Sequence, residues 1–375
     1  MRENKVVKLK DVISTKIQNG FSPLCQEDSS GVWVLSLGAW TGYSFDSSQR
    51  KAVSSSEKMP EEYKLKDNDI LVSRSNTLDK VGRCGVFHGE IDNCFYPDLM
   101  MRFRADEKIV LTKYLETVLQ SEFARKYFQE RAAGTSVSMM KINKKILEDF
   151  SFSLPSLKEQ EKIIKITLVW DSAIEKTEKL ISEKERMFSF LMKKILSKKG
   201  NTCYLNKIVT VKKGKQLNKE NMISNGTVPV LNGGISYSGF TNFANTQKNT
   251  IAISEGGNSC GYVNFVSEDF WAGGHCYTLE LKDKDVETKF LYWMLKSKER
   301  EIMNLRVGSG LPNIQQNDLC NLKIEIYNKN DQLKIIEVLD CQQRELSLLK
   351  KQLEQYKLQK QGLMQKLLTG EWRIE

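Results

Sequence analysis

Two aspartates and a lysine in the first third of the chain have the residue types of a magnesium-dependent nuclease. Asp98 and Asp106 could hold Mg²⁺, and Lys108 could help to activate the attacking water. The same residues also fit a strand that ends in a charged turn. Gly274 and Lys282 stand at the positions that correspond to Asp98 and Asp106 in the second half of the chain, so that half lacks the set. A stand-alone nuclease is therefore the less favoured alternative.

Polar and basic residues also follow several strand-like runs, next to glycines. Arg, Asn, Ser and Glu are side chains that contact base edges, and glycine lets the backbone approach a phosphate. The candidate DNA-contacting residues of the first half are Asn19, Ser73, Arg74, Ser75, Asn76, Lys80, Arg83, Arg131 and Thr135. Those of the second half are Lys215, Asn232, Tyr237, Ser238, Glu255, Asn258, Ser259, Arg306 and Ser309. Each of them also fits an ordinary polar turn.

The composition favours a polyanionic partner and excludes a membrane span. Lys and Arg outnumber Asp and Glu by 57 to 47, which gives a net charge of +10. No apolar run is long enough to cross a bilayer, and the first residues lack the apolar core of a signal peptide. The eight cysteines include no Cys-x-x-Cys pair and there are only two histidines, which argues against a zinc site. We expect a cytoplasmic chain with reduced thiols and no membrane partner.

Several catalytic and cofactor motifs are absent from the sequence. There is no phosphate-binding Gly-x-x-x-x-Gly-Lys-Ser/Thr loop and no Gly-x-Gly-x-x-Gly. The dipeptide Pro-Pro does not occur, which excludes the Asn/Asp-Pro-Pro-aromatic motif of amino-methyltransferases. The sequence therefore predicts a chain without catalysis or a cofactor of its own.

The second half of the chain repeats the first. Residues 142–147 align with residues 314–319 at an offset of 172, without gaps, and this alignment continues to residues 191–196 over residues 363–368. A predicted short helix at 113–121 matches another at 289–297, at an offset of 176. Such a repeat predicts two similar modules, each with a globule followed by a long helix.

The two long helices are predicted from a heptad pattern without proline. Positions spaced alternately four and three residues apart are mostly apolar, from Ile163 to Leu191 in the first helix and from Ile335 to Leu367 in the second. The exceptions are Thr177, Lys184, Gln342, Tyr356 and Lys360. Helices of about 40 residues need a partner, and the second globule lies between them in sequence, so we expect them to pair antiparallel. The predicted fold is α+β, with a pseudo-two-fold repeat of two mixed α/β globules separated by an antiparallel coiled coil.

With these features the chain resembles the DNA specificity subunits of type I restriction–modification systems. The matching segments are the join at 154–164, the closing residues 363–370, the strand exit at 69–74, and the pair of segments 230–235 and 253–257. The resemblance covers the whole chain in the family's order. The second join departs from it, because Ile326-Tyr327-Asn328 replaces the Leu-Pro-Ser of the first.

The resemblance implies a division into target-recognition domains and helices. The first recognition domain would be residues 1–155 and the central helix 156–200; the second recognition domain would be 201–328 and the last helix 329–375. Each domain would read one half of a bipartite, asymmetric site in double-stranded DNA. The helices would set the spacing and bind two methyltransferase subunits.

The resemblance also assigns the chemistry to partner subunits. The methyltransferase subunits would bind S-adenosylmethionine and methylate adenine N6. ATP and Mg²⁺ would also be bound by partner subunits, and the restriction subunits would cut the DNA. A second interpretation remains open, in which the chain is a non-catalytic coiled-coil scaffold that does not bind DNA. It explains the helices equally well, although it leaves the two basic, glycine-bearing globules unexplained.

Overall fold

The chain forms two compact units. The computed structural model describes residues 5–27, 31–40, 45–134, 139–308, 310 and 312–374. Unit 1 consists of Met1–Glu178 with Gln352–Glu375, and unit 2 of Lys179–Lys351. The units are divided differently from the four predicted segments, because each contains a globule together with part of both long helices. These helices are α4 (Leu157–Leu196) and α9 (Lys329–Thr369).

Unit 1 is built around two four-stranded sheets. The first has the order β2 (Gln18–Asn19), β10 (Met100–Phe103), β6 (Asp69–Ser73), β8 (Cys84–Phe87). The second has the order β3 (Cys25–Gln26), β5 (Arg50–Val53), β4 (Trp33–Leu35), β9 (Cys94–Phe95). Two further antiparallel pairs are β1 (Lys5–Lys8) with β12 (Ser151–Leu154), and β7 (Ser75–Asn76) with β11 (Met140–Lys141). The helices of the globule are α1 (Thr112–Gln120), α2 (Glu122–Arg131) and α3 (Lys144–Glu148), and its short 3-10 turns are η1 (Leu9–Asp11), η2 (Leu37–Ala39) and η3 (Glu61–Tyr63).

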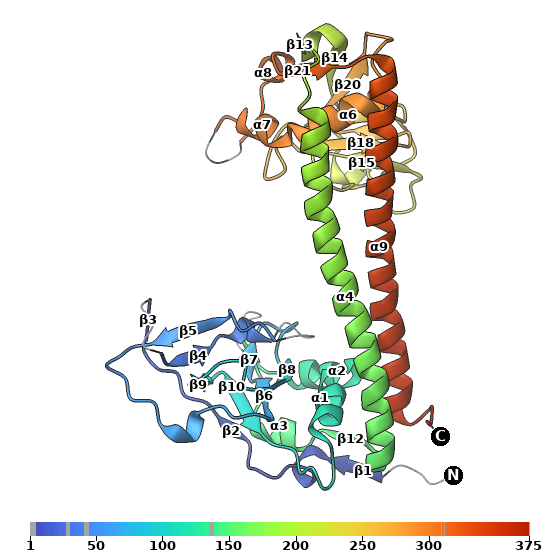
Figure 1. The fold of residues 1–375 in the computed structure, drawn as a ribbon. Helices are drawn as coiled ribbons and strands as arrows, with labels where there is room; N and C mark the ends of the chain where they lie inside the picture. The colour runs from blue at the N-terminus through green and yellow to red at the C-terminus, as the bar shows by residue number, and fades with distance from the viewer. Residues whose placement is uncertain are drawn as a thin grey trace. The chain divides into compact units, whose positions relative to one another are not determined.

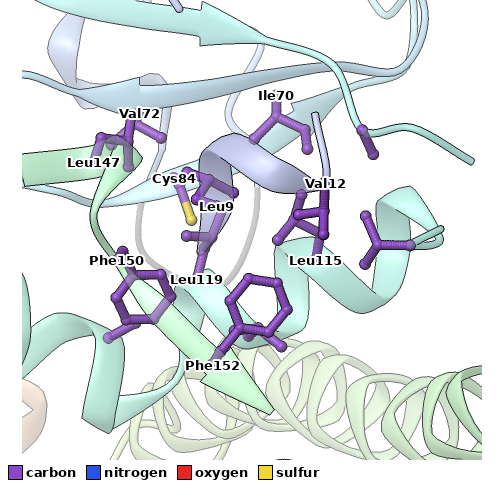
Figure 2. Packing of buried hydrophobic residues seen from close by; sticks show 14 of the residues in the cluster. Leu9, Val12, Ile70, Val72, Cys84, Leu115, Leu119, Leu147, Phe150 and Phe152 are labelled. Atoms are coloured by element: carbon purple, nitrogen blue, oxygen red, sulfur yellow. The ribbon is translucent and has the colours of Figure 1, made fainter. Parts of the chain in front are cut away.

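The core of unit 1 lies on both faces of β6, which is buried at all five positions. Successive side chains of a strand point to opposite faces, so Ile70 and Val72 enter one hydrophobic cluster and Leu71 enters another. Figure 2 shows the first cluster, with Ile70 and Val72 at one side and Phe150 and Phe152 at the other. Helices α1 and α2 lie between this sheet and the part of α4 that belongs to unit 1 (Figure 1).

Unit 2 repeats this plan. Its main sheet has the order β14 (Val209–Lys213), β20 (Cys276–Leu281), β17 (Thr250–Ser254), β18 (Val263–Val266). A three-stranded sheet has the order β16 (Gly239–Thr241), β15 (Val228–Leu231), β19 (Trp271–Ala272), and β13 (Asn201–Tyr204) pairs with β21 (Lys323–Ile326). The remaining elements are α5 (Leu205–Ile208), η4 (Lys219–Asn221), α6 (Thr288–Ser297), α7 (Glu299–Asn304) and α8 (Gln316–Cys320). The repeated order of elements explains the two sequence offsets.

Within unit 1, the long helices contact each other along their length. The Thr167 hydroxyl lies 3.3 Å from the Met364 sulfur, and the Lys357 ammonium lies 2.9 Å from the Glu178 carboxylate. Residue numbers rise along α4 as they fall along α9, so the two parts run antiparallel here.

Within unit 2, two ion pairs of 2.6 Å join the helices, Lys184 to Glu345 and Lys350 to Glu185. The predicted contact positions of α4 are displaced by one residue in this unit. Leu180 was expected in the seam, but it is 41% exposed, while Ile181 is buried. An α-helix has 3.6 residues per turn and drifts about 20° per heptad against a 3.5-residue pattern, which explains the displacement.

Candidate nucleic-acid interface

The polar loop after β6 is held by a set of backbone hydrogen bonds. The Arg74 amide donates to the Leu99 carbonyl at 2.8 Å, and the Arg74 carbonyl accepts from the Ile142 amide at 3.0 Å. One residue earlier, the Ser73 carbonyl accepts from Gly82, whose φ of +73° lies in the region that favours glycine. The side chain of Arg74 is therefore presented from a fixed backbone.

The loop after β17 in unit 2 has the same set of hydrogen bonds. The Glu255 amide donates to the His275 carbonyl at 2.9 Å, and the Glu255 carbonyl accepts from the Ile314 amide at 2.8 Å. The Ser254 carbonyl accepts from Gly261, which has a φ of +88°. Glu255 thus occupies in unit 2 the position that Arg74 occupies in unit 1. One backbone framework carries opposite charges at the same point.

Most of the predicted contact residues of unit 1 flank this loop. Asn19 lies at the end of β2, beside β10, and Asn76 lies in β7, where its Nδ2 is 3.5 Å from the Ser73 hydroxyl. Arg83 lies 3.9 Å from the Asp79 carboxylate. The exposed Lys80 begins the turn that leads to Arg83.

Arg131 lies at the end of α2. Its guanidinium lies 4.0 Å from the ring centre of Tyr127. The loop that follows is joined to β11 by reciprocal hydrogen bonds between Ala133 and Lys141, and β11 pairs with β7. Arg131 therefore stands at the start of a segment that leads to the Arg74 loop.

The structure corrects the prediction for two serines of unit 1. Ser73 and Ser75 are 2% and 1% exposed, so their side chains are buried within the loop and are not presented at the surface as predicted. A polar residue in a tight turn points inward as easily as outward, and sequence alone does not distinguish the two. The predicted contacts at Thr135 and Ser309 lie outside the described residues.

In unit 2, Glu255 is the centre of a cluster that the sequence analysis missed. The Lys213 ammonium donates to Glu255 Oε1 at 2.6 Å, and the Tyr277 hydroxyl lies 3.0 Å from the same oxygen. Burial and the hydrogen bond to Glu255 raise the pKa of Tyr277, which keeps it protonated. The exposed His275 places Nδ1 3.9 Å from Oε2. The only signal in the sequence was the basic run before Gly214.

Three more predicted residues lie around a second glycine turn of unit 2. The Ser259 hydroxyl donates to the Gly233 carbonyl at 2.7 Å. Asn232 precedes that glycine and packs against Gly273, whose added Cβ would meet the Asn232 side chain at 2.3 Å. The Lys215 amide donates to the Ala272 carbonyl, and the Lys215 side chain is exposed.

The remaining predicted residues of unit 2 are exposed. The Tyr237 hydroxyl donates to Glu268 at 2.9 Å, and burial together with this carboxylate raises the pKa of Tyr237 to about 12. Ser238 follows it in the chain. Asn258 and Arg306 are both exposed, and the residue after Arg306, Val307, is bridged to the segment that contacts the Glu255 loop.

Buried polar atoms without a hydrogen-bond partner gather at the predicted residues. In the described part of the chain, seven buried side-chain atoms lack a partner, and four of them belong to Asn19, Ser75, Asn232 and Glu255. A buried polar group without a partner is rare in folded proteins and calls for an explanation. A ligand that supplies the missing partners is one such explanation.

The nuclease alternative is not supported by the geometry. Asp98 precedes β10 and Asp106 follows it, and a four-residue strand alone spans roughly 13 Å. Asp98 accepts a hydrogen bond from Ser22, and Asp106 accepts one from the Lys108 amide at 3.1 Å. The two carboxylates therefore do not share a metal site. Across the described residues, no cluster of three or more His, Cys, Asp or Glu that could hold a metal ion is formed.

The chain belongs to the type I restriction modification DNA specificity family, whose model matches residues 1–185 and 199–357. A Mycoplasma pneumoniae protein named as a type I specificity subunit is 42% identical over 123 residues, which are 32% of each chain. The specificity subunit of the Escherichia coli K12 EcoKI type I restriction enzyme is 30% identical over 41% of this chain and 33% of its own. These alignments span about a third of the length of the relatives.

A solved structure shows the same fold over nearly the whole length. The S subunit of a type I restriction-modification system from M. genitalium matches 97% of this chain and 96% of its own, with 19% identity and a TM-score of 0.64. Among the described helices, none has the length and apolar character needed to cross a membrane.

Proposed function

We propose that this chain is a non-catalytic specificity subunit that reads a bipartite, asymmetric DNA site. Each globule reads one half-site, and partner subunits carry out adenine-N6 methylation and restriction. The observation that carries this proposal is the placement of Arg74 and Glu255 on the same backbone framework. Two modules that share a scaffold and differ in the side chains they present are suited to reading two different sequences.

The long helices are proposed to form one antiparallel coiled coil that relates the two modules by a pseudo-two-fold axis. The antiparallel contacts inside each unit support this arrangement. In this proposal the coiled coil sets the spacing between the half-sites. It also provides the binding surface for two methyltransferase subunits, and restriction subunits join the complex through them.

We assign the cofactors to the partners. S-adenosylmethionine belongs to the methyltransferase subunits, and ATP-driven translocation and cleavage belong to the restriction subunits. Mg²⁺ is also assigned to the partner subunits. A cytoplasmic location is proposed as well, supported by the eight cysteines, all of which lie in described segments and form no disulfide.

The proposal is tested by DNA binding at increasing salt concentration, with the chain bound to a methyltransferase partner. Proteins that neutralise phosphates release counterions, so the logarithm of the binding constant falls linearly with the logarithm of salt concentration. We expect this slope on all DNA and an additional, less salt-dependent affinity for the specific site. A complex that assembles without binding DNA would favour the scaffold interpretation. Methyl transfer by the chain alone would contradict its non-catalytic role.

A further inference from the structure

One carboxylate oxygen of Glu255 has two hydrogen-bond donors, and the other has none. Oε1 accepts from Lys213 and lies within hydrogen-bond distance of the Tyr277 hydroxyl. Oε2 is buried and has no hydrogen-bond partner, and the side chain as a whole is 9% exposed. The 3.9 Å from Oε2 to His275 Nδ1 is too long for a hydrogen bond.

The empty oxygen needs a donor, and its surroundings limit which donor fits. The Lys213 ammonium already neutralises the carboxylate, so the missing partner need not be a cation. His275 is 64% exposed at its side chain and its Nδ1 lies 3.9 Å from Oε2, so the oxygen lies beside a side chain at the surface. A neutral N–H donor that arrives from the surface would complete the carboxylate.

DNA offers such donors in the major groove. The exocyclic amines are N4 of cytosine and N6 of adenine, while guanine and thymine present acceptors at the corresponding edge. We propose that Glu255 selects a base with an exocyclic amine, cytosine or adenine, through Oε2. This inference rests on the proposed function and adds the class of base that this position of unit 2 reads.

The position in unit 1 has the opposite hydrogen-bonding character. Arg74 stands at the same point of the framework and carries donors only, which match the N7 and O6 acceptors of guanine. The two half-sites therefore require bases of opposite hydrogen-bonding character at one corresponding position. Unit 2 takes a base that donates there, and unit 1 takes guanine.

The test uses Glu255→Gln in the full complex with the methyltransferase partner, on a library of randomised sites. The Gln amide oxygen can still accept from Lys213, which places the amide nitrogen, a donor, where Oε2 was. We expect preference for cytosine or adenine to fall by roughly 5- to 150-fold at one position of one half-site, with guanine or thymine gaining. Glu280→Gln is the matched control, because that carboxylate is 62% exposed on the neighbouring strand.

A second variant keeps the proposal testable if Glu255→Gln does not fold. Arg74→Glu, at a partly exposed position, should replace guanine by cytosine or adenine at one position of the other half-site. Unchanged base preference at every position in a folded Glu255→Gln complex, or in the Arg74→Glu complex, overturns the inference and leaves the proposed function intact. A wild-type complex that methylates without sequence preference overturns the proposed function itself.

Discussion

Gln160 and Gln332 make the same three hydrogen bonds in the two units. Gln160 Oε1 accepts from the Leu111 amide at 2.9 Å, and its Nε2 donates to the carbonyls of Ile109 and Pro155. Gln332 repeats this with the Glu287 amide at 2.8 Å.

The second set is completed by the carbonyls of Asp285 and Tyr327, which accept from Gln332 Nε2 at 3.0 and 2.8 Å. Both glutamines are at most 1% exposed. In each unit, one side chain in the first turn of a long helix thus fixes that helix to its globule.

Replacing either glutamine by leucine should destabilise its own unit. Gln160→Leu leaves three backbone groups without their partner, and each unsatisfied buried group costs about 1–3 kcal/mol. We expect the free energy of unfolding of unit 1 to fall by about 3 kcal/mol or more, measured by urea denaturation followed by circular dichroism. Gln359→Leu, an exposed position of α9, is the control. Equal stability of the Gln160 and Gln359 variants would show that the three hydrogen bonds of Gln160 do not hold the helix to its globule.

Trp293 fills the core of unit 2 at a position where unit 1 has the smaller Thr117. Its ring lies edge-on to Phe188 at 5.7 Å between centroids, and its Nε1 donates to Asp340 at 2.8 Å. Trp293→Ala should lower the unfolding free energy of unit 2 by about 3–5 kcal/mol, because it leaves a cavity and removes the hydrogen bond to Asp340. Trp372→Ala, half exposed, should change it little. A similar loss in both variants would contradict this account of the core.

Tyr237 should titrate above its usual range. Partial burial and the nearby Glu268 carboxylate raise its pKa to about 12, from an ordinary value of 10.0. The folded state therefore holds the phenol proton more tightly than the unfolded state, so the stabilisation is complete below pH 10 and is lost as the pH rises from about 10 to about 12. The difference in ultraviolet absorbance between the wild type and Tyr237→Phe isolates this group. Ionisation near pH 10, unchanged in Glu268→Gln, would contradict the role of the carboxylate.

Local patterns were sufficient to predict several of the regular elements. The strand-like runs at 69–72 and 250–253 lie in β6 and β17, and the heptad pattern predicted both α4 and α9. These elements depend on side-chain periodicity, which is visible in a short window of sequence.

The site was harder to predict because its contacts join distant residues. Lys213 and Tyr277 reach Glu255 only through the antiparallel pairing of β14, β20 and β17, and no local pattern records that register. The burial of Ser73 and Ser75 depends on the same packing. A serine precedes both Arg74 and Glu255 in the sequence, and the backbone hydrogen bonds establish that the two residues are equivalent.

The central claim is that two readers are held at a distance set by the long helices. Seven residues inserted after Lys179 in α4, and seven after Lys351 in α9, fall at the border of the two units and keep the heptad pattern in phase. Each helix becomes about 10 Å longer. An insertion of three or four residues in one helix alone shifts its contacts and should impair folding first.

Methylation mapping of the heptad variant, with its partner subunits, tests the claim most directly. At about 3.4 Å per base pair, the gap between the two half-sites should grow by up to about three base pairs, with both half-site sequences unchanged. The gain is smaller if the DNA must twist to compensate for the rotation of the second half-site. A variant that folds and supports methylation, yet keeps the original gap, would show that the helices do not set the distance.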